Sequence, residues 1–265
     1  MKIGFIGLGN MAKAIIGGLL KEEIVAPADI LGASKTRETE QRTRDQYGIT
    51  ILGSNREVAE AADVLVLAIK PVFVGEVIEE IRGSMNKDAL IISIVAGKNI
   101  AFLENAFGSS DVHIVRTMPN TPAMVGEGCT GVCVSGNVTD EETELALKLM
   151  GSFGKAYLVP ERLIDVVGAV SGSSPAFVFM FIEAMADGAV AGGMPRAQAY
   201  RFAAQAVLGS AKLVLETGMH PGELKDMVCS PGGTTIEGVK TLEEKGLRGA
   251  VMDAMEATLN KTKKL

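Results

Sequence analysis

The fold of this chain is decided by residues 2–12, KIGFIGLGNMA, where a short apolar run leads directly into closely spaced glycines. Gly7, Gly9 and Ala12 follow the G-x-G-x-x-G/A pattern that joins the first strand and helix of a dinucleotide-binding βαβ unit. There the first glycine permits a tight turn, the second lets a pyrophosphate approach the backbone, and the third small residue lets helix and strand pack closely. The segment predicts a cofactor phosphate loop, with a glycine-rich turn that binds no ligand as the alternative. The loop consists of Gly7, Leu8, Gly9, Asn10, Met11 and Ala12.

Around this loop, residues 1–160 alternate apolar strand-like runs with helical stretches. Continuous apolar runs such as VLVLAI (64–69) are typical of strands covered on both faces. We predict strands at 2–7, 29–34, 64–69, 90–95, 113–116, 128–136 and 156–159, and helices at 11–21, 37–47, 140–152, 175–194, 196–216, 221–228, 234–244 and 247–261. The pattern predicts an α/β fold: an N-terminal doubly wound Rossmann domain of parallel βαβ units (residues 1–160), followed by an all-α domain (residues 161–265).

The composition argues against several other classes of protein. With 26 basic and 32 acidic side chains among 265 residues, the net charge is −6, so we expect no nucleic-acid partner. Two histidines and three cysteines are too few for an all-cysteine zinc site or a disulfide framework, so we expect no metal and a reducing, cytoplasmic location. The apolar run 175–194 carries Glu183 and Asp187 near its middle. This disfavours membrane insertion and indicates a buried core helix or a subunit-interface helix, with no membrane partner.

A cationic turn after the second predicted strand bears on the choice between the two nicotinamide cofactors. NAD-specific folds usually place an Asp or Glu at the end of this strand, where it binds the ribose 2′-hydroxyl. Here the strand ends in Ser34-Lys35-Thr36-Arg37, and the next acid is Glu38. Lys35 as a point charge and Arg37 as a bidentate donor suit a 2′-phosphate. The turn therefore favours NADPH, with NADH as the alternative cofactor and a solvated basic turn as the alternative structure.

A second glycine-dense segment is SPGGTTIE, residues 230–237. Thr234 and Glu237 have the S/T-x-x-E spacing of a capping box, which predicts a helix start. Two glycines ahead of a helix leave backbone N–H groups open to an anion and remove side chains that would block it. The segment therefore predicts a carboxylate pocket in which Thr235 supplies a hydroxyl, with a capped helix and an unoccupied flexible loop as the alternative.

This segment, with KDMV (225–228) before it, resembles the signature of the pyrroline-5-carboxylate reductases. Further motifs fall in the family's order: IGLGNMAKAI (6–15), AIKP (68–71), MPNTP (118–122), SGSSPAF (171–177) and EAMADG (183–188). The resemblance runs from residue 2 to beyond residue 255. It implies NADPH-dependent reduction of L-Δ1-pyrroline-5-carboxylate to L-proline by hydride transfer to the C=N bond, the last step of proline biosynthesis. It also implies a homodimer formed through the helical domain, with higher oligomers of dimers as an extension.

The resemblance also implies roles for single residues. Ser34, Arg37 and Asn55 would surround the adenosine ribose phosphate. The cofactor trough at the strand ends would be lined by Ala68, Ile69, Lys70, Pro71, Ile94, Val95, Ala96 and Gly97. The substrate would be bound by Gly232, Gly233, Thr234, Thr235, Asn120 and Glu161, with Thr235 as the catalytic group.

Two positions depart from the family pattern, and two rival functions fit the sequence less well. Phe177 stands where family members often have Tyr and Ser174 where Gly is common, so we assign Phe177 to packing. Lys70 is the best alternative catalytic group. A β-hydroxyacid dehydrogenase would use a helix lysine after a glycine-rich stretch, and residues 175–194 contain none. A non-catalytic NADP-binding sensor would not need the carboxylate pocket near Thr235.

Overall fold

The structure, a computed structural model, describes residues 1–262, which divide into two compact units. Unit 1 comprises residues 1–173 together with the described residues from Thr258 onward, and unit 2 comprises residues 174–257. The sequence pattern changes at residue 161, whereas the spatial division falls at Ser174. The two differ because the helical segment beginning at Glu161 packs on the sheet of unit 1, where Ile164 is fully buried.

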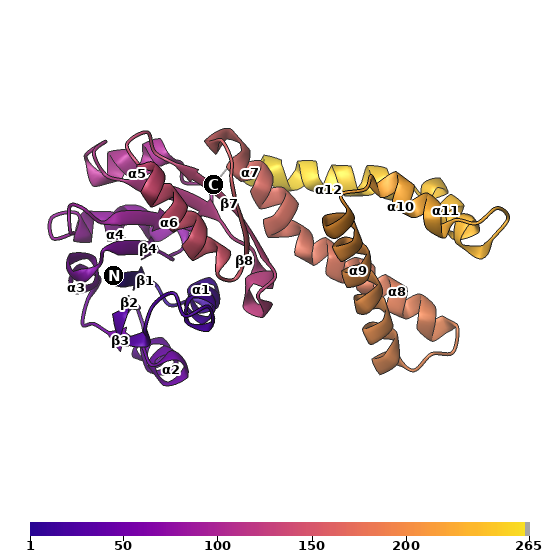
Figure 1. Ribbon diagram of the computed structural model, residues 1–265, viewed down its shortest axis with the longest axis horizontal. Coiled ribbons are helices and arrows are strands. Elements are labelled where there is room, and N and C mark those ends of the chain that lie inside the picture. Colours follow the sequence, from indigo (N-terminus) through magenta and orange to yellow (C-terminus); the bar gives the residue numbers. More distant parts are fainter. Residues whose placement is uncertain (263–265) are drawn as a thin grey trace. The chain divides into compact units, whose positions relative to one another are not determined.

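Unit 1 is built on one eight-stranded sheet with the order β3-β2-β1-β4-β5-β6-β7-β8 (Figure 1). The strands are β1 (Ile3–Ile6), β2 (Ile30–Ala33), β3 (Thr50–Ile51), β4 (Val64–Leu67), β5 (Leu90–Ser93), β6 (Ile114–Met118), β7 (Gly128–Val134) and β8 (Gly154–Leu158). The first six are parallel, and their order reverses after β3, which confirms the doubly wound fold. β7 is antiparallel to β6, so the prediction of parallel units fails there. Its link, residues 119–127, is shorter than the roughly dozen residues of a parallel crossover.

Helices cover both faces of this sheet. In unit 1 they are α1 (Asn10–Lys21), α2 (Arg37–Tyr47), α3 (Asn55–Ala61), α4 (Val74–Ile81), α5 (Ile100–Phe107), α6 (Asp140–Gly151) and α7 (Ile164–Val167). Along β4, Val64 and Val66 join the core with α1 and α6, whereas Leu65 and Leu67 join the core with α3, α4 and α5. A strand buried on both faces is what the apolar run 64–69 predicted. The sequence reasoning missed β3, α3, α4 and α5, each only two to eight residues long.

A continuous helical run, Glu161–Ala191, leads along the chain from unit 1 into unit 2. It contains α7, a π-helical stretch (Gly168–Ser173) and α8 (Ser174–Ala191). The π-helical stretch ends two residues before Pro175, which is the second residue of α8. Because proline has no N–H, it cannot donate the usual helical bond to the carbonyl of Ser171. Within residues 1–262 this run alone has the length and hydropathy of a membrane span, a property that core helices of soluble proteins share.

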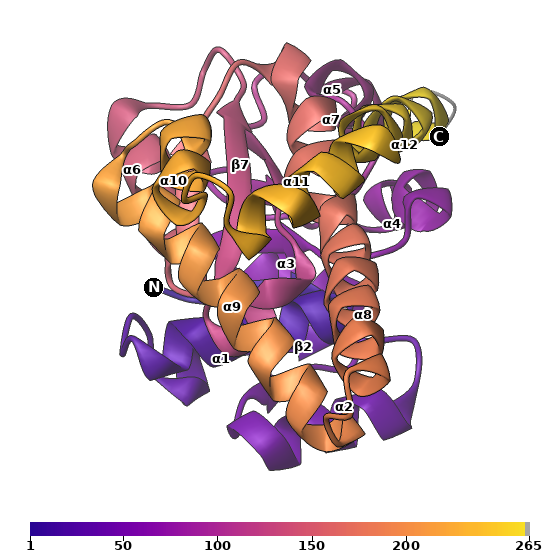
Figure 2. The ribbon, with the colours of Figure 1, turned by 90° about the vertical axis from the view of Figure 1, so that its right-hand side faces the viewer.

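Unit 2 is helical, and its own core is small. It contains α8, α9 (Arg196–Thr217), α10 (Pro221–Val228), α11 (Thr234–Glu244) and most of α12 (Leu247–Thr262). α8 and α9 pack against each other (Figure 2), and the residues buried between them are Ala186, Ala199 and Ala203. On α8, Phe179 is 63% exposed and Met180 68% exposed. The prediction of a buried core helix at 175–194 is therefore wrong for the single chain, which leaves the alternative of a subunit interface.

Candidate functional site

The loop between β1 and α1 contains two glycines with different requirements. Gly7 has φ +93°, and a Cβ there would lie 2.4 Å from the carbonyl oxygen of Ala68, so the chain itself requires glycine. Gly9 is the N-cap of α1 with φ −74°, and a Cβ there would meet nothing within 4 Å. No side chain caps this helix, and its first turn has no acid. The open space before uncapped helix N–H groups fits a phosphate, so this loop suits a dinucleotide.

The other residues predicted to bind the cofactor follow neighbouring parallel strands. Backbone N–H groups in successive strand ends donate across the sheet, from Gly7 to the carbonyl of Ala33 (2.9 Å) and from Ala68 to that of Ile6 (2.9 Å). The N–H of Ile94 donates to the carbonyl of Leu67 at 3.2 Å. β1 lies between β2 and β4, where the strand order reverses. Ligands of open α/β sheets bind beyond the strand carboxyl ends at this point. The structure thus brings the phosphate loop, Ser34, residues 68–71 and residues 94–97 to one edge.

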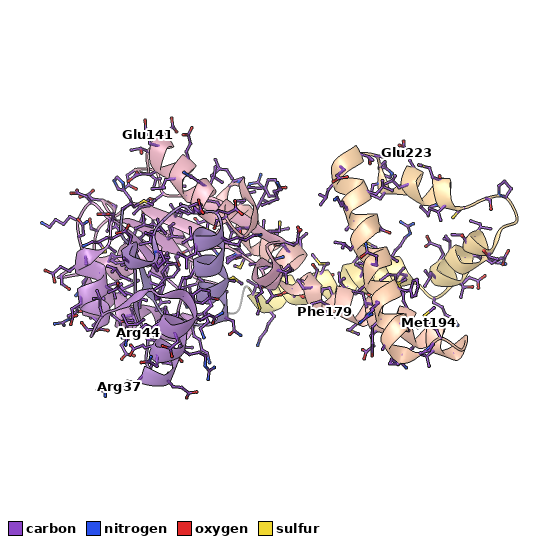
Figure 3. All side chains as sticks on the ribbon, turned by 60° about the horizontal axis from the view of Figure 1, so that its bottom comes forward. Arg37, Arg44, Glu141, Phe179, Met194 and Glu223 are labelled. Carbon is purple, nitrogen blue, oxygen red and sulfur yellow. The ribbon has the colours of Figure 1, made fainter. Side chains whose placement is uncertain are left out.

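At the end of β2 the predicted residues have specific partners. Lys35 lies with its ammonium 5.3 Å from the centre of the Phe73 ring, and Arg37, the first residue of α2, is exposed (Figure 3). Asn55 donates through its side chain to Glu80 at 2.9 Å. The N–H of Ser34 donates to the carboxylate of Glu40 at 3.1 Å. The sequence placed Glu40 only among the charged residues near a solvated basic turn, and did not indicate its contact with Ser34. The signal was available, since a second acid occupies the first turn of the predicted helix 37–47.

The loop between α10 and α11 repeats the arrangement of an uncapped helix start. Gly232 has φ +67°, and Gly233 is the extended N-cap of α11. A Cβ on Gly233 would lie 2.4 Å from Oγ of Ser230. No side chain caps α11, and Thr234 is its first residue, so the predicted capping box is wrong: a cap must precede the helix. Thr235 is exposed and, within residues 1–262, has no hydrogen-bond partner for its hydroxyl.

Two further residues predicted to bind substrate are already engaged within unit 1. Asn120 is buried, donates from Nδ2 to the carbonyl of Ser171 (2.9 Å) and accepts at Oδ1 from the N–H of Cys129 (2.8 Å). Glu161 accepts at Oε1 from the N–H of Ile100 (2.7 Å), at the start of α5.

Glu161 is also part of an ionic cluster around the buried Arg116, in which both acids are partly exposed. Arg116 lies on β6 with its side chain only 4% exposed, and it contacts Glu161 at 3.3 Å and Asp165 at 2.8 Å. Sequence reasoning missed both Arg116 and Asp165, since an arginine inside an apolar strand gives no indication of its partners. The cluster fastens the start of the helical run Glu161–Ala191 to the sheet.

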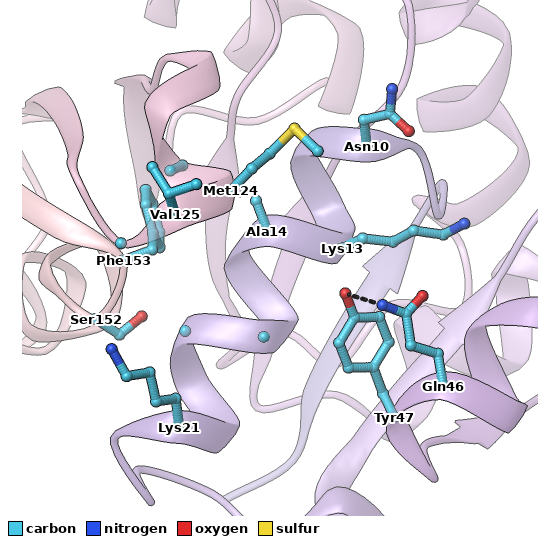
Figure 4. A pocket seen from close by; sticks show the side chains of 14 residues that line it. Asn10, Lys13, Ala14, Lys21, Gln46, Tyr47, Met124, Val125, Ser152 and Phe153 are labelled. Atoms are coloured by element: carbon cyan, nitrogen blue, oxygen red, sulfur yellow. Dashed lines mark hydrogen bonds between the residues drawn. The ribbon is translucent and has the colours of Figure 1, made fainter. Parts of the chain in front are cut away.

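A separate cleft of about 540 Å³ lies beside α1 (Figure 4). Lys13 projects from α1 on the side of Gln46 and Tyr47, and Lys21 projects on the side of Ser152. Tyr47 accepts a 3.0 Å hydrogen bond from the side chain of Gln46. Of the residues predicted to bind the cofactor, only Asn10 lines this cleft. The cleft is therefore distinct from the trough expected for the cofactor.

The chain matches known proteins along its whole length. Residues 161–265 match the family described as pyrroline-5-carboxylate reductase dimerisation, and residues 2–97 match the family described as NADP oxidoreductase coenzyme F420-dependent. Pyrroline-5-carboxylate reductase of Escherichia coli K12 is 54% identical over 264 residues, which cover 100% of this chain and 98% of that relative. This chain belongs to the pyrroline-5-carboxylate reductase family.

Solved structures of the pyrroline-5-carboxylate reductase family share the whole fold. The enzyme of Coxiella burnetii superposes with a TM-score of 0.91 at 35% identity, covering 99% of this chain and 97% of that chain. The pyrroline carboxylate reductase of Plasmodium falciparum, solved with NADP bound, gives 0.89 at 33% identity, covering 100% and 97%. These matches confirm the family predicted from the motifs and the order of its two domains.

Proposed function

We propose that this member of the pyrroline-5-carboxylate reductase family reduces L-Δ1-pyrroline-5-carboxylate to L-proline with NADPH, the last step of proline biosynthesis. One observation carries the proposal beyond family membership. α1 and α11 each begin with a glycine N-cap in an extended conformation and with no side-chain cap. One start suits the pyrophosphate of the cofactor and the other suits the carboxylate of the substrate.

On the cofactor side, the phosphate loop binds the pyrophosphate through the first N–H groups of α1. Ser34, Lys35, Arg37 and Asn55 surround the adenosine ribose and its 2′-phosphate. Residues 68–71 and 94–97 line the trough at the ends of β4 and β5. When bound, NADPH supplies the hydride that reduces the C=N bond. The chain contributes chiefly by holding both reactants in one geometry, which can supply several kcal/mol of rate enhancement.

On the substrate side, the first N–H groups of α11 bind the carboxylate, with Gly232 and Gly233 leaving room for it. The hydroxyl of Thr235 bonds at the imine nitrogen and orients the ring. Asn120 and Glu161 serve this site by positioning the chain, because their polar atoms already bond to Ser171 and to Ile100.

The family match also supports a homodimer formed through unit 2. The buried core of α8 and α9 is three alanines, whereas Phe179 and Met180 lie in solvent. A helical unit with so little buried apolar surface needs a partner to cover it. We place this dimer, and higher oligomers built from it, in the cytoplasm, consistent with the three free thiols of Cys129, Cys133 and Cys229.

The proposal is tested by following the absorbance of the reduced cofactor with two substrate pairs. In the mixture of pyrroline-5-carboxylate and NADPH, the absorbance of NADPH should fall at a rate proportional to the enzyme concentration. In the mixture of 3-hydroxyisobutyrate and NADP, no reduced cofactor should form and the absorbance should not rise. The reverse pattern would identify a β-hydroxyacid dehydrogenase, and no turnover in either mixture would favour a non-catalytic sensor.

A further inference from the structure

An acidic side chain reaches the end of β2, where the sequence favours a 2′-phosphate bound by Lys35 and Arg37. Glu40, on the first turns of α2, folds back so that its carboxylate accepts the N–H of Ser34 at 3.1 Å. Ser34 directly follows β2, so this N–H belongs to the strand end expected to bind the adenosine ribose. Glu40 and Ser34 are both partly buried. The positive end of the α2 dipole favours a carboxylate held there.

None of the cations near Glu40 in the sequence forms an ion pair with it among residues 1–262. Arg42 pairs with Glu38 at 2.7 Å, and Lys35 lies over the ring of Phe73. Arg37 has no ion pair within residues 1–262. The carboxylate of Glu40 therefore has no ion-pair partner among residues 1–262, and its hydrogen bond to Ser34 places it at the strand end proposed to receive a 2′-phosphate.

The two cofactors present opposite chemistry to such a carboxylate. The 2′-hydroxyl of NADH can donate a hydrogen bond to it, the role that a strand-end acid plays in NAD-binding folds. The 2′-phosphate of NADPH is an acceptor carrying negative charge, so it competes with Glu40 for the Ser34 N–H and is repelled by it. Lys35 and Arg37 favour the phosphate, and Glu40 opposes it.

We propose that Glu40 sets the balance between the two cofactors, weakening NADPH and retaining NADH as a usable reductant. The inference rests on the proposed cofactor site and adds a specificity-determining residue to it. Removing the negative charge should move the preference further toward NADPH.

The test measures dissociation constants of NADPH and NADH separately, from the fluorescence of the reduced nicotinamide and without substrate. Glu40→Gln keeps an oxygen that can accept the Ser34 N–H but removes the charge. The ratio of the NADH to the NADPH dissociation constant should rise about five-fold, the size expected of one charge pair at a partly exposed site. Glu38→Gln, two residues earlier in the same helix, is the matched control and should leave the ratio unchanged.

The outcomes separate this inference from the proposed function. If wild type binds both cofactors and Glu40→Gln leaves the ratio unchanged or moves it toward NADH, the role of Glu40 is wrong while the reductase assignment stands. If wild type binds neither cofactor, both fail together. A purely structural role would lower the melting temperature of Glu40→Gln without altering the ratio, so thermal unfolding of both variants is measured in parallel.

Discussion

The side-chain amide of Asn120 donates a 2.9 Å hydrogen bond to the carbonyl of Ser171, the residue four positions before Pro175. Proline has no N–H, so the helix leaves this carbonyl without its normal donor, and Asn120 supplies one. The side-chain oxygen of Asn120, Oδ1, accepts a 2.8 Å hydrogen bond from the N–H of Cys129. One side chain thus joins the end of β6, the start of β7 and the π-helical stretch that precedes α8.

This relationship predicts that Asn120→Ala destabilises the protein by about 1–3 kcal/mol per buried group left unsatisfied. Chemical denaturation of wild type and variant measures the difference. Asn86→Ala is the matched control, since Asn86 also bonds through its side chain to a carbonyl, that of Ala62 at 3.2 Å, but lies nearer the surface. If both variants lost the same free energy of unfolding, the bond to Ser171 would stabilise the fold no more than the bond of Asn86 does.

The two glycines of the phosphate loop should separate folding from binding. Gly9→Ala has room for its methyl group and an ordinary φ, so its free energy of unfolding should change by less than about 1 kcal/mol. Because the methyl group enters the space assigned to the pyrophosphate, NADPH binding should weaken roughly ten-fold, or about 1.4 kcal/mol.

Gly7→Ala should behave differently, because a Cβ there clashes with backbone and the residue has positive φ. It should destabilise the fold as well as weaken cofactor binding. Unfolding curves and NADPH titrations are compared for both variants. If Gly9→Ala bound NADPH with normal affinity, the pyrophosphate would not bind at this loop.

The thiol of Cys133 should make stability fall in alkali. Burial, helped by the nearby negative charge of Glu161, raises the pKa of this thiol from 9.0 to about 12. The folded state therefore holds the proton while the unfolded chain releases it. The contribution to stability is complete below about pH 9 and is lost as the pH rises toward 12, at up to about 1.4 kcal/mol per pH unit.

Cys133→Ala lacks this contribution, so the difference in unfolding free energy between wild type and variant should shrink between pH 8 and pH 10 by roughly 1.4 kcal/mol. Denaturant titrations at several pH values measure it. A difference that stays constant across this range would mean that the thiol ionises equally in both states.

The hydroxyl of Thr235 should matter to turnover and not to cofactor binding. Thr235→Ala should lower kcat with pyrroline-5-carboxylate by about ten-fold or more, because one hydrogen bond at the reacting centre is lost. The NADPH dissociation constant should stay within about two-fold of wild type, since the proposal assigns Thr235 to the substrate and none of the cofactor contacts to it. Thr234→Ala, the adjacent residue of the same helix start, is the comparison. Small and equal effects on kcat and on NADPH binding would exclude this role.

Local patterns predicted much of the fold, and long-range contacts account for what was missed. Helices 37–47, 221–228 and 234–244 have the predicted bounds. Gly48 ends the first of them in the left-handed conformation, and Pro221 begins the second. Asn120 and Ser171 are 51 residues apart, and nothing local in either indicates the other. Arg116 likewise pairs with Glu161 and Asp165, which are distant in the sequence and come close only because the helical run beginning at Glu161 packs on the sheet. The capping box at Thr234 failed because the same spacing fits a helix whose cap is the preceding glycine.

The central claim is that this chain transfers a hydride from NADPH to the C=N bond of pyrroline-5-carboxylate. The most direct measurement uses NADPH labelled with deuterium at the transferable position of the nicotinamide ring, with mass spectrometry of the product. The account predicts L-proline carrying one deuterium on the ring carbon that belonged to the C=N bond, formed in equal amount to the NADPH consumed. Unlabelled proline, or NADPH consumption without proline, would contradict it.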